Sequence, residues 1–123
     1  MDISYYLKII YTKNNQEYPF LNCWGLVCEY YKQEKNITLD LFKDDDLFSI
    51  NSKYLDFRKK LTEISKPAAG VIVAFFKKDI IKHVGIYLSS ERILHTDRIT
   101  RIQSLKEIVK VKNYSGVKFY DAL

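Results

Sequence analysis

The feature that most restricts the fold is a continuous apolar run at residues 71–76, in the second half of the chain. A short run of this kind, without interspersed polar residues, is typical of a strand buried on both faces of a sheet. A second apolar segment follows at residues 83–88, and turn residues at 89–91 separate it from residues 92–95. These segments predict neighbouring strands of a small antiparallel sheet, with a last strand at residues 116–120.

The first half of the chain carries helical periodicity instead. Apolar residues at helical spacing predict a short opening helix within residues 2–10, before a polar loop over residues 12–21. One or two further helices are expected within residues 44–64, and a short helix or turn at residues 105–109. Helices followed by an antiparallel sheet make the expected fold class α+β.

Length and composition predict one folded domain. The 123 residues fit a single domain over residues 1–123, and charged residues are interspersed among 47% hydrophobic ones. No apolar run approaches the roughly 18 residues that span a bilayer, so no membrane contact is expected. The N-terminus lacks the basic region of a signal peptide. The net charge of +5 comes without any nucleic-acid-binding motif, so nucleic acid is not an expected partner.

A second helix is predicted to begin after Asn22, a residue type favoured at the N-cap. Cys23 then lies in the first turn, where the helix dipole stabilises a thiolate and lowers the pKa of the thiol. Cys28 falls in the middle of the same helix, where a buried structural cysteine is expected. On one helix the two side chains point apart, and the distance between their Cα atoms exceeds the ~7 Å limit for a disulfide. Cys23 is therefore a candidate nucleophile.

The two histidines, His83 and His95, lie on consecutive predicted strands. If a three-residue turn sets Leu88 opposite Arg92, both histidines share one face of the sheet, about 7 to 8 Å apart at Cα. A turn of two or four residues would place them on opposite faces. Two converging histidines and a cysteine at a helix terminus indicate a nucleophile, a base and an orienting residue. The same register would set Asp97 opposite His83, as an alternative orienting residue.

Four blocks of sequence together resemble one enzyme family. Residues 22–27, Asn-Cys-Trp-Gly-Leu-Val, are similar to the Asp-Cys-Ser/Trp-Gly-Leu-Val signature of NlpC/P60 cell-wall cysteine peptidases. Residues 70–75 look like the Gly-Asp-hydrophobic strand of that family, and residues 83–87 look like its base-bearing strand. Residues 93–95 resemble the strand whose histidine orients the base. Tyr11 falls where the family commonly has a tyrosine beside the nucleophile.

The resemblance implies an α+β, papain-like fold with N-terminal helices packed on a small antiparallel sheet. It implies Cys23 as nucleophile, His83 as base and His95 as orienting residue, with no metal or cofactor. The expected substrate-binding residues are Tyr11, Asn22 and Trp24. Three departures bear on specificity. Asn22 replaces Asp while keeping a helix cap, residues 12–14 replace Trp-Gly-Gly, and Val replaces the Asp after the glycine of residues 70–75.

The implied activity is hydrolysis of peptidoglycan peptide stems, between D-glutamate and the following diamino acid. The form of residues 22–27 and the lysine-rich stretch after them look most like the branch found in phage tail assembly proteins. Phage tail proteins are therefore expected partners. The protein would be made in the cytoplasm and act at the bacterial cell wall, in association with a virion tail. The alternatives are an amidase or acyltransferase on the same fold, or a non-catalytic tail or wall-binding protein.

Overall fold

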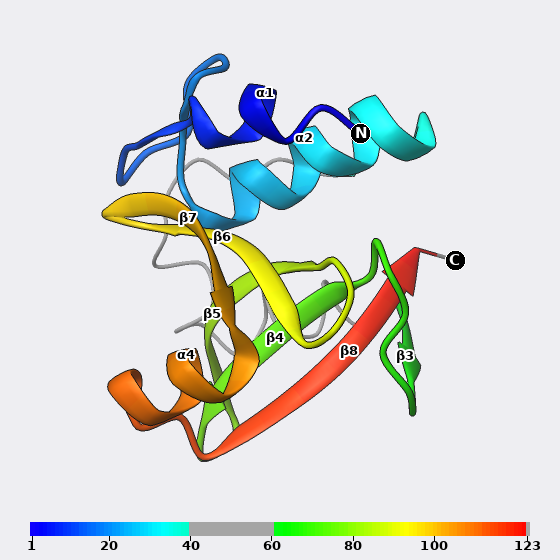
Figure 1. Ribbon diagram of the computed structural model, residues 1–123, viewed down its shortest axis with the longest axis vertical. Helices are drawn as coiled ribbons and strands as arrows, with labels where there is room; N and C mark the ends of the chain where they lie inside the picture. The colour runs from blue at the N-terminus through cyan, green and yellow to red at the C-terminus, as the bar shows by residue number, and fades with distance from the viewer. Residues whose placement is uncertain (40–60, 123) are drawn as a thin grey trace.

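The computed structural model describes residues 1–39 and 61–122, and it is built around an antiparallel sheet of six strands (Figure 1). The strands run in the order β3-β8-β4-β5-β6-β7 across the sheet. The strands of this sheet are β3 (Leu61–Ile64), β4 (Ile72–Lys77), β5 (Ile80–Tyr87), β6 (Arg92–Asp97), β7 (Ile99–Ser104) and β8 (Gly116–Ala122). The helices are α1 (Ile3–Leu7), α2 (Cys23–Lys35) and α4 (Leu105–Lys112). The α+β class and the N-terminal helices packed on an antiparallel sheet are confirmed.

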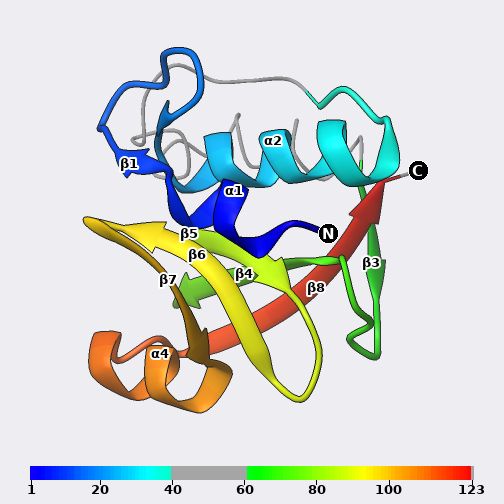
Figure 2. The ribbon, with the colours of Figure 1, turned by 45° about the horizontal axis from the view of Figure 1, so that its top comes forward.

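Helices cover both faces of the sheet, α1 and α2 on one side and α4 on the other (Figure 2). Alternate residues of β4 divide between the two layers, as a pleated strand requires. Ile72 and Ala74 join the core formed with α1 and α2, while Val73 and Phe75 join a second core that includes Ile108 of α4. The apolar run at residues 71–76 is buried throughout, which confirms the prediction of a strand buried on both faces.

Helix α2 begins and ends where its sequence provides caps. The Asn22 side chain accepts a hydrogen bond from the Gly25 N–H at 3.0 Å, so the predicted N-cap is confirmed. Asn36 ends the helix in the left-handed conformation, with φ of 55°. Two lysines lie in the last turn, where their positive charge suits the negative end of the helix dipole. The helix packs on β5 and β6 and so fixes Cys23 over that part of the sheet.

The hairpin between β5 and β6 sets the register of the two histidines. Leu88 donates its backbone N–H to the Arg92 carbonyl at 2.8 Å, across a three-residue turn. Ile86 pairs with Leu94, and Tyr87 pairs with Ile93. This is the register that places His83 and His95 on one face, so that reading of the turn is confirmed.

Several local predictions were wrong because long-range pairing decided the structure. Residues 61–64, expected at the end of a helix, form β3 and pair with β8 at the other end of the sequence. The rest of that helical prediction, residues 44–60, lies outside the described residues. A short parallel pair, β1 (Ile10–Tyr11) with β2 (Phe20–Leu21), replaces the expected end of the first helix and part of the loop. Strand β7 was not predicted, because it is a half-exposed edge strand and its polar residues interrupt the apolar pattern typical of a strand.

Candidate active site

The two histidines meet on the sheet face that α4 covers. The His83 Nε2 and His95 Nδ1 atoms are 2.8 Å apart, within hydrogen-bonding distance. His83 lies opposite Phe75 in the β4–β5 ladder, and their rings stack with centroids 5.6 Å apart. The exposed fractions are 5% for His83 and 3% for His95. The structure therefore brings the predicted base and the predicted orienting residue into direct contact, shielded from water.

Gly85 permits the close approach of β5 and β6 at this point. A Cβ atom on Gly85 would lie 2.8 Å from Cγ2 of Ile93, 3.0 Å from the Leu94 carbonyl oxygen and 3.0 Å from Cβ of His95. Carbon atoms do not approach this closely without displacement. The absence of a side chain at Gly85 therefore helps to hold His95 where it reaches His83.

Asp97, the alternative orienting residue, is engaged elsewhere. Its carboxylate forms an ion pair with Lys112 of α4, with 3.2 Å between Oδ2 and Nζ. Burial alone would raise the pKa of Asp97, but attraction to His83 and the bond to Lys112 outweigh it and leave that pKa below its usual value. The His83 ring nitrogen that could face an orienting residue is taken by His95. Asp97 thus supplies negative charge near His83, while the direct contact with His83 is made by His95.

Burial also controls the charge of the histidine pair. It lowers the pKa of His83, and the neighbouring His95 lowers it further, against the opposing attraction of Asp97. Burial lowers the pKa of His95 as well, while the hydrogen bond that His95 makes to the Gln103 oxygen acts in the opposite direction. Both imidazoles are therefore neutral near pH 7, the state in which one of them can accept a proton.

Gln103 of β7 is a polar contact that the sequence analysis missed. Its Oε1 atom lies 2.9 Å from Nε2 of His95 and 3.1 Å from Nε of Arg101. Gln103 pairs with Ile93 in the β6–β7 ladder, so its side chain lies on the same face as His95. Polar and apolar residues alternate only weakly along residues 99–104, and that was the available signal.

Cys23 approaches this region from α2, on the other layer of the molecule. It is the first residue of α2, directly after the Asn22 cap, and is 7% exposed. Tyr114 links the two sides of the site. Its ring is nearly parallel to His83, at an interplanar angle of 9° and a centroid distance of 6.5 Å. Burial raises the pKa of Tyr114, and negative charge on Asp97 and on Cys23 raises it further. Tyr114 is thus within electrostatic reach of Cys23 while it stacks beside His83.

This geometry can be compared with known proteins. A family model described as the NlpC/P60 family matches residues 10–119. The chain belongs to the NlpC/P60 family. A solved structure, the NlpC/p60 domain of the peptidoglycan hydrolase SagA, is similar with a TM-score of 0.59 and 14% sequence identity. The match covers 96% of this chain and 90% of the SagA domain, which supports the NlpC/P60 fold. No curated protein matches the chain.

Asn22 and Trp24, both expected at the substrate, are buried in this NlpC/P60 domain. Asn22 is 0% exposed, and its amide is used twice within the protein: Oδ1 accepts from Gly25, and Nδ2 donates to the Lys13 carbonyl at 3.1 Å. Trp24 is 4% exposed and belongs to the core beneath α2. Asn22 therefore holds the preceding loop to the start of α2, and Trp24 is a core residue.

Tyr11 is half-buried and lies at the end of β1. It pairs with Leu21 in the parallel ladder, and Leu21 is two residues before Cys23. The Thr12 N–H continues the pairing by donating to the Leu21 carbonyl at 3.1 Å. The loop between them thus returns the chain so that Tyr11 lies beside the segment that leads into α2.

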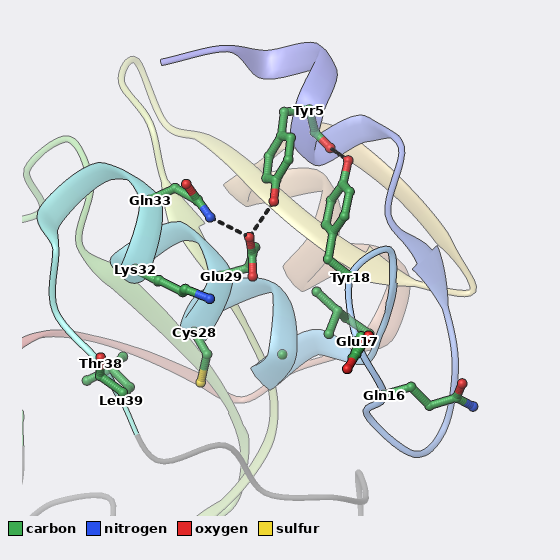
Figure 3. A pocket seen from close by; sticks show the side chains of 12 residues that line it. Tyr5, Gln16, Glu17, Tyr18, Cys28, Glu29, Lys32, Gln33, Thr38 and Leu39 are labelled. Carbon is green, nitrogen blue, oxygen red and sulfur yellow. Dashed lines mark hydrogen bonds between the residues drawn. The ribbon is translucent and has the colours of Figure 1, made fainter.

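Cys28 lies in a different environment (Figure 3). It lines a pocket between α1, the loop before β2 and α2, where Tyr5 donates a hydrogen bond to Glu29. Burial raises the pKa of the Cys28 thiol, and negative charges on Glu29 and Cys23 add to the effect. Cys28 is therefore held as a thiol, which agrees with the structural role expected from its place in the middle of the helix.

Cys23 is expected to react with iodoacetamide at least about tenfold faster than Cys28 near neutral pH, because the thiolate is the reactive form. The two residues are similarly buried, 7% and 9% exposed, so the difference reports thiolate character more than access. Peptide mapping by mass spectrometry after a brief treatment measures both rates in one sample. Equal labelling, or faster labelling of Cys28, would remove Cys23 as the candidate nucleophile.

Over residues 1–39 and 61–122, no group of three His, Cys, Asp or Glu side chains is arranged to hold a metal ion. Within the same ranges, no helix has the length and apolar character needed to cross a bilayer.

Proposed function

We propose that this NlpC/P60 domain is a cysteine peptidase that hydrolyses the peptide stems of bacterial peptidoglycan. The observation that carries the proposal is the buried contact between His83 and His95, in a domain whose helix α2 begins with Cys23. A buried pair of neutral imidazoles is an arrangement that serves proton transfer and is costly to maintain for packing alone. The similarity to a domain of the peptidoglycan hydrolase SagA supports the substrate class.

The roles follow from this geometry and from the chemistry of thiols. His83 takes the proton from Cys23, and the thiolate sulfur attacks the carbonyl carbon of an amide. His95 holds the imidazolium that forms on His83. The backbone N–H of Cys23, at the positive end of α2, meets the oxyanion. The protonated His83 then gives its proton to the leaving amine as the carbon–nitrogen bond breaks, and water hydrolyses the thioester to restore Cys23.

The bond and the biological setting are narrower proposals that rest on the sequence resemblance. The bond is that between D-glutamate and the following diamino acid. The resemblance of residues 22–27 to the tail-assembly branch supports action at the host wall as part of a phage tail, with tail proteins as partners. Because residues 12–14 and Val71 depart from the family pattern, the preference among diamino acids is expected to differ from that of typical relatives.

Digestion of purified peptidoglycan tests the activity. Wild type is incubated with sacculi of several stem compositions, and the released muropeptides are identified by mass spectrometry. The expected products end at D-glutamate and begin at the diamino acid, and they are absent with Cys23→Ala but present with Cys28→Ala. Release of intact stems would indicate an amidase, and transfer of an acyl group without hydrolysis would indicate an acyltransferase. Binding to sacculi without any product would contradict an enzymatic role.

A further inference from the structure

Gln103 completes a chain of hydrogen bonds that runs through both histidines. Its Oε1 contacts Nε2 of His95 at 2.9 Å, and Nδ1 of His95 contacts Nε2 of His83 at 2.8 Å. We infer that Gln103 is a positioning residue that fixes the tautomer of both imidazoles, so that Nδ1 of His83 is the atom that accepts the proton of Cys23. The inference rests on the proposed function for the identity of the proton donor, but the tautomers themselves follow from the contacts.

Arg101 determines which way the Gln103 amide faces. The oxygen and nitrogen of a glutamine amide are nearly alike in shape, so their assignment depends on the surrounding hydrogen bonds. Arg101 Nε lies 3.1 Å from the same Gln103 atom that contacts His95. A guanidinium nitrogen only donates, so the atom it meets must be the amide oxygen. Nε2 of His95, which faces this oxygen, therefore carries a proton.

The protonation of His95 then dictates that of His83. A neutral imidazole carries one N–H and one bare nitrogen, so a proton at Nε2 of His95 leaves its Nδ1 as an acceptor. The nitrogen that faces it, Nε2 of His83, must donate in order to form the 2.8 Å contact. A neutral His83 with its proton at Nε2 presents a bare Nδ1. The orientation that Arg101 gives to the Gln103 amide thus determines the tautomer of His95, and through it the tautomer of His83.

The surroundings keep this chain defined. The two histidines are 5% and 3% exposed, so water has little access to the hydrogen bonds between them and Gln103. Residues of α4, including Ile108 and Lys112, line the small pocket over the pair together with Gln103. The charged groups that act on the pair are Asp97, Arg101 and Lys112, and the ring of Tyr114 lies beside His83. Nε2 of His95 faces Gln103.

The chemical consequence is specific to the proton transfer. With Nδ1 of His83 bare, the proton of the Cys23 thiol moves to that atom as the sulfur attacks the carbonyl carbon. The resulting imidazolium keeps its Nε2–H on His95, and the new Nδ1–H is the proton given to the leaving amine. In the other tautomer, Nδ1 of His83 already carries a proton and cannot act as base. Loss of the Gln103 acceptor is therefore expected to lower kcat by roughly tenfold to a thousandfold, because part of the population holds the wrong tautomer.

Nitrogen-15 NMR of the imidazoles tests the inference without any substrate, and the chain has two histidines, so assignment is direct. At pH 7.5 both histidines of the wild type are expected as Nε2–H tautomers. In Gln103→Leu, which removes the acceptor, His95 should lose this preference and kcat should fall. In Gln103→Glu, which keeps an acceptor beside Arg101, the tautomer should be retained and kcat should exceed that of the leucine variant. The added negative charge should also move the acidic limb of the pH–rate profile to higher pH.

The control is Gln33→Leu, the same substitution at an exposed position of α2. It should leave the imidazole spectrum and kcat as in wild type. A wild-type His95 protonated at Nδ1, or a Gln103→Leu variant with unchanged tautomers and unchanged kcat, would overturn the role of Gln103. If the wild type shows the expected tautomers but releases no muropeptides, the proposed function fails while the positioning by Gln103 stands.

Discussion

Replacing His83 by alanine is expected to lower kcat/KM on peptidoglycan stems by about 10,000-fold or more, since removal of the base also removes the acid for the leaving amine. His95→Ala should retain measurable activity, because His95 acts through His83 and touches no reacting atom in the proposed mechanism. Rates are measured by release of free amino groups from purified stem peptides. Circular dichroism and the melting temperature establish that each variant is folded at the assay temperature.

Asp97→Asn provides the matched comparison for this pair. It keeps the size of the side chain and removes the charge that pairs with Lys112 and attracts His83. Asp97 supplies charge but does not contact His83 directly. Asp97→Asn is therefore expected to lower kcat/KM by about tenfold or less, a smaller loss than that of His95→Ala. A silent His95→Ala together with a crippling Asp97→Asn would show that Asp97, not His95, orients the base. Activity of His83→Ala near the wild-type level would remove the proposed mechanism.

The part of the site that could be predicted from the sequence is the part encoded by local signals. Asn22 is an N-cap by residue type, and this alone set Cys23 in the first turn of a helix. The turn at residues 89–91 was also predicted from residue type, but its length was left open, and the observed three-residue form is what places His83 and His95 on one face. Short-range rules therefore located the helix start and the turn, and the structure selected the register.

The parts that could not be predicted depend on pairings between distant segments. Leu61 reads as the end of a helix until its partner Ala122 is known, 61 positions away in the sequence. Gln103 gives no sign of function by itself, because its contact with His95 exists only once β7 folds back on β6. The same holds for Tyr114, which reaches the site from the segment between α4 and β8. Sequence spacing cannot indicate such contacts without the topology of the sheet.

At Gly85, a single added Cβ atom would disturb both the packing of the sheet and the histidine pair. Gly85→Ala is expected to destabilise the domain by about 1 to 3 kcal/mol through overpacking. An alanine in a strand would ordinarily gain up to about 1 kcal/mol over glycine, so the expected sign is reversed by the local contacts. Its Cβ would lie 3.0 Å from the backbone oxygen of Leu94 and 2.8 Å from Cγ2 of Ile93. The side chain of Ile93 could rotate away, but the backbone oxygen can move only if β6 moves.

A shift of β6 would carry His95 with it, so Gly85→Ala is also expected to lower kcat by at least about tenfold, as a loosened contact to the base implies. Gly116→Ala is the matched control, because the nearest atom to its Cβ is Cβ of Phe76 at 3.9 Å, an ordinary contact. Thermal melts and kcat are measured for both variants. The expected pattern is a lower melting temperature and lower kcat for Gly85→Ala, with Gly116→Ala close to wild type. If Gly85→Ala instead melted like wild type and kept its kcat, the close approach of β5 and β6 would not be what holds His95 against His83.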